Sequence, residues 1–159
     1  MEMLDRGIAR GKTQWVRDAL MQNLRRLEVF GHPFTGYVGQ VTSLRNYYKT
    51  SMALLEPLTW HELFPKERPV YTKVKNEPPT RYRESAHVQN SLVANGCIIE
   101  GTVQNSVIFR GVKISKGTTI KDSIVMQKSV IGEDCLLQNV ILDKEVVVTG
   151  TKNLVGDPD

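Results

Sequence analysis

Five side chains in this sequence belong to the types that most often perform acid–base, nucleophilic or metal chemistry: His32, His61, His87, Cys97 and Cys135. The three histidines lie far apart in the sequence, and an isolated histidine is more often a surface or packed residue than a ligand or a general base. The two cysteines lack a CxxC partner and lack a histidine at metal-ligand spacing. Both lie among aliphatic residues, which predicts buried, reduced thiols. These side chains therefore predict neither a catalytic residue nor a metal site.

Arg81 is a candidate for binding an anion. It ends the segment Pro-Pro-Thr-Arg at residues 78–81. A guanidinium can bind a phosphate group through two parallel hydrogen bonds. The alternative is a solvated arginine beside Arg83 and Glu84, in an arrangement common on protein surfaces. Both interpretations remain open for this residue.

Length and composition limit the class of protein. The 159 residues are enough for one ordinary domain, or for one compact domain with part of another. The net charge of +4 comes from basic residues that are interleaved with acidic ones, so we expect no nucleic-acid partner. Every apolar run is far shorter than the roughly 20 residues that cross a bilayer, so we expect no membrane span and a cytoplasmic protein.

Two amphipathic helices are predicted before residue 57. The first covers residues 13–27 with Thr13 as its N-cap, and the second follows Ser43 as N-cap and is ended by Pro57. The apolar stripe of the second helix consists of Leu44, Tyr47, Tyr48, Ser51, Met52 and Leu55. Between the helices, residues 29–41 are rich in glycine and aromatic residues and predict short strands or turns.

The segment that follows is rich in proline. Its prolines are Pro57, Pro65, Pro69, Pro78 and Pro79. Because proline fixes φ and restricts the residue before it, residues 57–85 are predicted to be an extended linker. Residues 70–72, Val-Tyr-Thr, are a candidate short strand within it.

From residue 86 to residue 150 the pattern changes to short aliphatic steps with a period of six. One row of such steps runs Ile108, Ile114, Ile120 and Met126, and the residues predicted to point inward are Val93, Ile99, Ile114, Ile120, Ile131 and Leu137. Each six-residue step would form one flat side of a triangular coil of about 18 residues. The sequence thus predicts a left-handed parallel β-helix of about three and a half coils. A β-sandwich would alternate with period two instead.

Some sides of this β-helix contain more apolar residues than an interior needs. Val107, Ile108, Phe109, Val125 and Met126 would point in both pleat directions. The terminal coils would also expose unpaired backbone groups. We therefore expect some of these apolar side chains to face a partner subunit.

Three segments resemble one enzyme family, in the order in which that family has them. Residues 36–43, Gly-Tyr-Val-Gly-Gln-Val-Thr-Ser, resemble the end of the nucleotidyltransferase domain of bacterial and plant glucose-1-phosphate adenylyltransferases. Residues 68–72 with the prolines at 78 and 79 resemble their interdomain linker, and residues 105–112 resemble their β-helix. The resemblance implies three regions: a nucleotidyltransferase-like end at 1–56, a linker at 57–85 and a left-handed β-helix at 86–159.

The resemblance also implies that this chain is not catalytic. Catalytic members have the motif Tyr-Trp-x-Asp-Val-Gly-Thr, whose aspartate helps to hold magnesium, whereas this sequence has Gln40 at that position and Thr42 in place of the glycine. A carboxamide lacks the charge that Mg²⁺ prefers. No glycine-rich phosphate loop precedes the first helix, because Gly7 and Gly11 are too sparse. We therefore expect a piece of a longer protein that binds neither the Mg nor the ATP of its catalytic relatives.

By this resemblance the parent protein is a D-type accessory subunit of glycogen biosynthesis, which regulates by assembling with a catalytic adenylyltransferase subunit in a homo- or hetero-oligomer. Arg81 would occupy the place of a cationic effector contact found in relatives. Two alternatives remain open. A catalytically competent nucleotidyltransferase fragment is disfavoured by Gln40, and a hexapeptide acyltransferase is disfavoured because its β-helix uses a histidine base and no histidine lies between Val88 and Asp159.

Overall fold

The computed structural model describes residue 16 and residues 20–157, which belong to two compact units, residues 1–35 and 36–159. In the described part of the first unit, Met21–Asn23 forms a short 3₁₀ helix, η2. Thr13 and much of the predicted first helix lie outside the described residues. Residues 29–41 form no strand, contrary to one of the two predictions for that segment.

The second predicted helix is present in the second unit as α2, Leu44–Ala53. Ser43 is its N-cap, as predicted, and its hydroxyl accepts a hydrogen bond of 3.1 Å from the backbone N–H of Asn46. Pro57 does not end this helix. It is instead the first residue of α3, Pro57–Leu63, inside the predicted linker. Proline is well tolerated there, because the N–H groups of a first helical turn have no intrahelical partner.

The rest of the predicted linker is irregular up to the first strand of the solenoid. Residues 64–80 form no helix or strand, so the strand predicted at residues 70–72 is absent. Regular structure resumes at β1, Arg81–Tyr82, five residues before the predicted start of the repeats. No helix among the described residues is long and apolar enough to cross a membrane.

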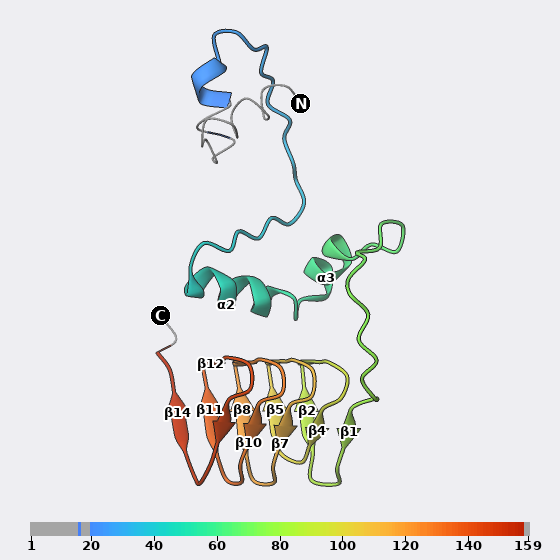
Figure 1. Cartoon of the computed structure of the whole chain (residues 1–159), viewed down its shortest axis with the longest axis vertical. Coiled ribbons are helices and arrows are strands. Elements are labelled where there is room, and N and C mark those ends of the chain that lie inside the picture. Colours follow the sequence, from blue (N-terminus) through green and yellow to red (C-terminus); the bar gives the residue numbers. More distant parts are fainter. Residues whose placement is uncertain (1–15, 17–19, 158–159) are drawn as a thin grey trace. The chain divides into compact units, whose positions relative to one another are not determined.

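Residues 81–155 form a parallel β-solenoid of about four turns, which confirms the predicted β-helix and rules out the sandwich (Figure 1). Three parallel sheets make its sides. Sheet A is β1-β4-β7-β10-β13, sheet B is β2-β5-β8-β11-β14, and sheet C is β3-β6-β9-β12. After β1 the strands are β2 (His87–Gln89), β3 (Leu92–Val93), β4 (Ile98–Ile99), β5 (Thr102–Gln104), β6 (Val107–Ile108), β7 (Lys113–Ile114), β8 (Thr119–Lys121), β9 (Ile124–Val125), β10 (Val130–Ile131), β11 (Leu136–Gln138), β12 (Ile141–Leu142), β13 (Val147–Val148) and β14 (Asn153–Val155).

The coils are shorter than the predicted 18 residues. Lys113 pairs with Val130, and Val130 with Val147, so these coils hold 17 residues. One residue is saved at the corner from sheet B to sheet C, where Asp122 takes a left-handed φ of 46°. Short polar side chains tolerate that conformation better than most. Because of this shift the inward residue of β9 is Val125, and Met126, which the six-residue row predicted, is not.

One coil is shorter still. Ile98 pairs with Lys113, so this coil holds 15 residues. Two residues are missing at the corner from sheet A to sheet B, where Gly101 is buried. A Cβ on Gly101 would lie 2.3 Å from the carbonyl oxygen of Thr118 in the next coil. Only glycine permits such a close approach of two backbones.

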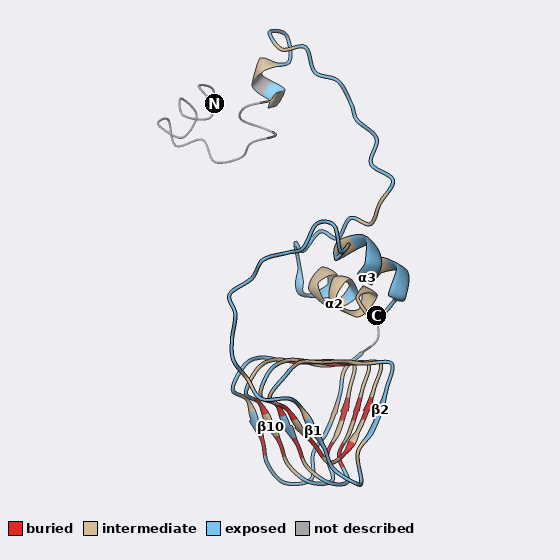
Figure 2. Cartoon of the chain, turned by 90° about the vertical axis from the view of Figure 1, so that its right-hand side faces the viewer, coloured by how far each residue is buried: buried red, intermediate tan, exposed pale blue. Residues whose placement is uncertain are grey.

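The interior of the solenoid is an aliphatic stack (Figure 2). Five of the six predicted inward residues are fully buried, and Val93, in the first complete coil, is partly buried against them. Cys97 and Cys135 are free and buried, as predicted. The core cluster comprises Cys97, Ile99, Val103, Ile108, Val112, Ile114, Ile120, Val125, Ile131, Cys135, Leu137 and Val148.

Candidate functional site

The outer surface of sheet C is an apolar row that this chain itself covers. Strand residues alternate in direction, so Ile108 and Val125 join the interior while Val107 and Ile124 point outward. Nevertheless Val107 is only 9% exposed and Ile124 is 0% exposed. The register places Leu92 and Ile141 in the same outward row. We expected a partner subunit to cover residues of this kind, but Val107 and Ile124 are already buried within one chain.

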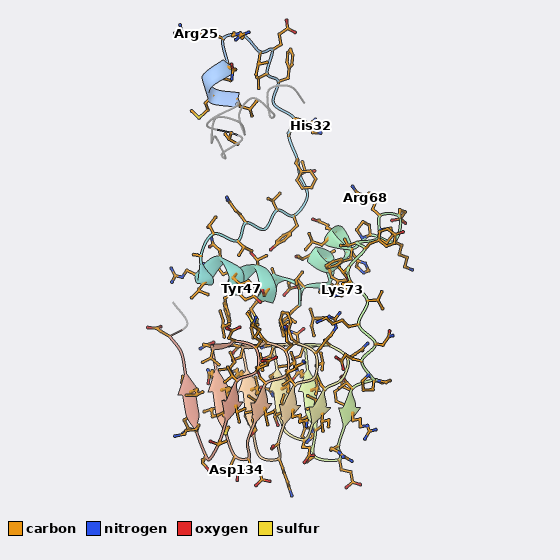
Figure 3. All side chains as sticks on the ribbon, in the orientation of Figure 1. Arg25, His32, Tyr47, Arg68, Lys73 and Asp134 are labelled. Atoms are coloured by element: carbon orange, nitrogen blue, oxygen red, sulfur yellow. The ribbon has the colours of Figure 1, made fainter. Side chains whose placement is uncertain are left out.

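The element over this row is α2, which lies along sheet C in two perpendicular views (Figures 1 and 2). Its half-buried residues include Tyr47, Tyr48, Met52 and Leu55 of the predicted stripe, and side chains fill the space between α2 and the solenoid (Figure 3). Leu44, which was predicted to belong to the stripe, is 76% exposed in the first turn. We call the contact of α2 with sheet C the α2 seat.

A single hydrogen bond fixes the position of α2 on the corner between sheets B and C. The Tyr48 hydroxyl donates to the backbone carbonyl oxygen of Asp122 at 2.6 Å. Burial raises the pKa of Tyr48 above its usual value of 10, and the negative charge of Asp122 raises it further. The phenol therefore stays neutral and able to donate over the whole physiological pH range.

The corner that receives Tyr48 is built from stacked polar side chains. The backbone N–H of Ser106 donates to the hydroxyl of Ser91 at 3.1 Å, and that of Ser123 donates to the hydroxyl of Ser106 at 3.1 Å. Each of the two buried hydroxyls, on Ser106 and Ser123, donates in turn to a carbonyl two residues earlier at 2.6 Å. Because these buried polar groups are satisfied, the corner is a rigid acceptor for Tyr48.

Residues 36–42, which we call the Gln40 segment, are held against the two helices. The backbone N–H of Tyr37 donates to the Glu62 carboxylate of α3 at 2.6 Å. Asn46 of α2 donates through its side-chain amide to the hydroxyl of Thr42 at 2.8 Å. Gln40 itself is exposed, and it is the neutral residue at the position of the family's metal-binding aspartate.

Gly39 brings this segment close to α2. A Cβ on Gly39 would lie 2.7 Å from the methyl carbon of Thr50. That separation is too short for two carbon atoms, since non-bonded carbons pack about 3.5–4.0 Å apart. The glycine therefore lets the backbone beside Gln40 contact the middle of α2.

A separate pocket of about 390 Å³ lies at the corner between sheets A and B. Three carboxylates and one ammonium surround it, from Glu100, Glu133, Asp134 and Lys116. The remaining lining residues are Ser85, Gly101, Thr102, Gly117 and Thr118. The sequence did not predict this pocket. In the part of the chain that the structure describes, no three His, Cys, Asp or Glu side chains are arranged to hold a metal ion.

Arg81 lies elsewhere, on the edge strand β1 of sheet A. Its backbone N–H donates to the carbonyl of Cys97 at 2.9 Å, and its side chain is exposed. The neighbouring Arg83 approaches Glu100 at 3.8 Å, an exposed pair that contributes little stability. Arg81 and Gln40 are not among the residues that line the pocket, and the three histidines are exposed on separate elements.

Sequence reasoning found both halves of the α2 seat but did not join them. The helical stripe and the doubly apolar strands were both visible. An apolar outward row such as Val107 and Ile124 was the available signal, because it requires a cover. What the sequence could not supply was which element provides that cover.

Comparison with known proteins agrees with this architecture. The GlmU-like, C-terminal hexapeptide family matches residues 77–158. Over 133 residues the chain is 45% identical to the glycogen biosynthesis protein GlgD of Bacillus subtilis (strain 168), a match that covers 84% of this chain and 39% of that protein. It is 55% identical to GlgD of Geobacillus stearothermophilus over 71 residues, which are 45% of this chain and 21% of that protein.

A glucose-1-phosphate adenylyltransferase of Bacillus cereus (strain Q1) is 34% identical over 121 residues, covering 76% of this chain and 32% of the enzyme. The chain therefore spans about two fifths or less of the length of the curated relatives that it matches. Both kinds of relative were expected from the resemblance of residues 36–43 and 105–112. With the family match covering more than half of its residues, the chain belongs to the GlmU-like C-terminal hexapeptide family.

Proposed function

We propose that this chain is the C-terminal part of a non-catalytic, regulatory and assembly subunit of glucose-1-phosphate adenylyltransferase in cytoplasmic glycogen biosynthesis. The similarity to GlgD over most of the chain supports the assignment to glycogen biosynthesis. The observation that carries the non-catalytic role is Gln40. It stands, exposed and uncharged, where catalytic members of the family have a magnesium-binding aspartate.

The chemistry explains why this one residue matters. Catalytic adenylyltransferases join ATP and glucose 1-phosphate into ADP-glucose and release pyrophosphate. Negative charge develops on the phosphate oxygens during such a transfer, and the metal ion neutralises it. Mg²⁺ gives up its water reluctantly and favours anionic oxygen ligands. A subunit with a carboxamide at this position would contribute through contacts with a catalytic subunit rather than through its own turnover.

The solenoid suits a role in assembly. Its sides are rigid, so that a partner can bind to them at a small cost in conformational entropy. The outward residues of sheet A combine apolar and cationic side chains, with Val147 62% exposed and Arg81 and Lys113 exposed. We propose Arg81 as the residue that contacts a phosphate-bearing effector.

The test uses the full-length parent protein. It is purified alone, together with its catalytic partner, and the partner is purified alone, and ADP-glucose formation is measured with magnesium. We expect no turnover above background for the parent alone, and a changed rate or effector response for the pair. Turnover by the parent alone at the rate of the catalytic subunit would refute the non-catalytic assignment.

A deletion tests the assembly role separately. Removal of residues 81–155 should abolish co-purification of the parent with its catalytic partner. Intact association after this deletion would mean that the solenoid is not the assembly surface.

A further inference from the structure

We infer that α2 is a coupling element, through which the solenoid sets the conformation of the Gln40 segment. The inference rests on two contacts that α2 makes on different sides, one with sheet C and one with residues 36–42. It does not depend on the proposed function, because it concerns how two parts of the fold hold each other in position. It identifies which contacts would transmit a change at the solenoid to the segment that contains Gln40.

The first link joins α2 to the solenoid. Ile124 and Val107 are buried on the outside of sheet C, and the Tyr48 hydroxyl bonds the Asp122 carbonyl at 2.6 Å. The carbonyl belongs to a corner whose backbone is fixed by a left-handed φ and by the serine stack. This corner therefore cannot adjust easily when α2 shifts, and any displacement of the corner would move α2.

The second link joins α2 to the Gln40 segment. The Asn46 side chain holds Thr42, and the Thr50 methyl group faces the backbone at Gly39. Tyr37 at the start of the segment is held by Glu62 of α3, which follows α2 after three residues. The segment has no regular structure of its own, so these side-chain contacts determine where it lies.

The covalent connection between the helices and the solenoid is a poor alternative route. Residues 64–80 form no helix or strand, and exposed residues predominate among them. A chain of this kind transmits little displacement, because its backbone dihedrals can absorb it. The α2 seat is the route with packed and hydrogen-bonded contacts.

The experiment is amide hydrogen exchange by NMR on the 159-residue chain, read at Tyr37, at the amides of α2 and at solenoid amides such as Ile99 and Ile131. In Tyr48→Phe we expect exchange at Tyr37 and in α2 to be about fivefold faster, because one buried hydrogen bond is lost, while the solenoid amides stay unchanged. The matched control is Tyr47→Phe, which removes a hydroxyl from the next residue of the same helix.

A second pair of variants keeps the test independent of the hydroxyl. Ile124→Val and Ile120→Val each remove one methylene from a fully buried isoleucine, the first under α2 and the second inside the solenoid. Ile124→Val should accelerate exchange in α2 and at Tyr37, and Ile120→Val should affect the solenoid instead. Unchanged exchange at Tyr37 in both Tyr48→Phe and Ile124→Val would overturn the inference. Equal acceleration throughout the chain would overturn it as well, because it would indicate a global loss of stability rather than a link.

Discussion

Tyr48 and Asp122 are separated by 74 residues in the sequence, yet the phenol of one donates a 2.6 Å hydrogen bond to the main-chain carbonyl of the other. This bond joins the end of a nucleotidyltransferase-like segment to the second corner of a repeat coil. It also makes the α2 seat sensitive to alkaline pH. The phenol can donate only while it is protonated, and the fold raises its pKa above 10.

The first prediction is that the stability difference between the wild-type chain and Tyr48→Phe depends on pH. A group whose pKa is raised by folding stabilises the native state fully below its unfolded value of 10, and this contribution is lost as the pH rises through the folded value. We expect Tyr48→Phe to be less stable by about 1 kcal/mol at pH 8, as for loss of one hydrogen bond. Urea unfolding of both proteins between pH 8 and pH 11 measures the difference, which should shrink in the alkaline range. A difference that stays constant with pH would contradict the assignment.

A second prediction concerns the solenoid interior. Ile120 is fully buried, so Ile120→Asp would place an unpaired carboxylate in the aliphatic stack at a cost of several kcal/mol. We expect this variant to be insoluble or unfolded by circular dichroism. Val147→Asp is the control, since Val147 points outward from sheet A and should tolerate the charge. A folded, soluble Ile120→Asp protein would show that the interior is not closed.

The short coil gives a third prediction. In Gly101→Ala the new methyl group would meet the Thr118 carbonyl oxygen, so either the corner must open or the coils must separate. We expect a loss of roughly 2 kcal/mol or more in the free energy of unfolding, within the range for overpacking of a core. Gly31→Ala is the matched control, because nothing lies within 4 Å of its added Cβ. Equal stabilities of the two variants in urea would refute the proposed close approach.

The fourth prediction is that the two thiols are unreactive in the native protein. Burial raises the pKa of Cys97, and the charge of Glu77 raises it slightly further, while hydrogen bonds from neighbouring groups act in the opposite direction. Cys135 is also buried. A disulfide reagent at pH 8 should label neither thiol until urea unfolds the chain, when both should react. Rapid labelling without denaturant would mean that the corners of the solenoid open frequently.

The fifth prediction tests the catalytic assignment in the full-length parent. Gln40→Asp restores the family's carboxylate, but we expect no ADP-glucose formation from the parent alone, because one ligand does not rebuild a magnesium and nucleotide site. The same substitution should leave the free energy of unfolding nearly unchanged, since residue 40 is exposed. Turnover after this single change would show that the rest of the site is intact.

The sequence predicted the architecture of the repeats well, because buried positions such as Ile99, Ile114 and Ile131 must be aliphatic and recur at fixed steps. It missed the coil length and the inward residue of β9. Val125 and Met126 are adjacent and both apolar, so hydrophobicity alone could not distinguish them. The left-handed backbone at Asp122 made the choice, and residues of that type also occur in ordinary turns.

The candidate site was less predictable for a similar reason. Proline at residue 57 fits both the end of one helix and the first position of the next, and the structure uses the second possibility. The cover of Val107 and Ile124 depends on a contact over a long sequence separation, about which local patterns carry no information. Arg81 could be recognised as a cation, but neither its strand nor its distance from the pocket at Glu100 and Asp134 followed from the sequence.

The covered outer row of sheet C also decides where this protein can be cut for expression. A fragment that starts at β1 would contain every repeat, but it would leave Leu92, Val107, Ile124 and Ile141 as a continuous aliphatic strip in water. Contiguous apolar patches of this kind favour aggregation. A fragment that starts at Gly36 retains α2 and keeps the strip dry, so the smallest well-behaved piece is defined by a helix outside the repeats rather than by the repeats themselves.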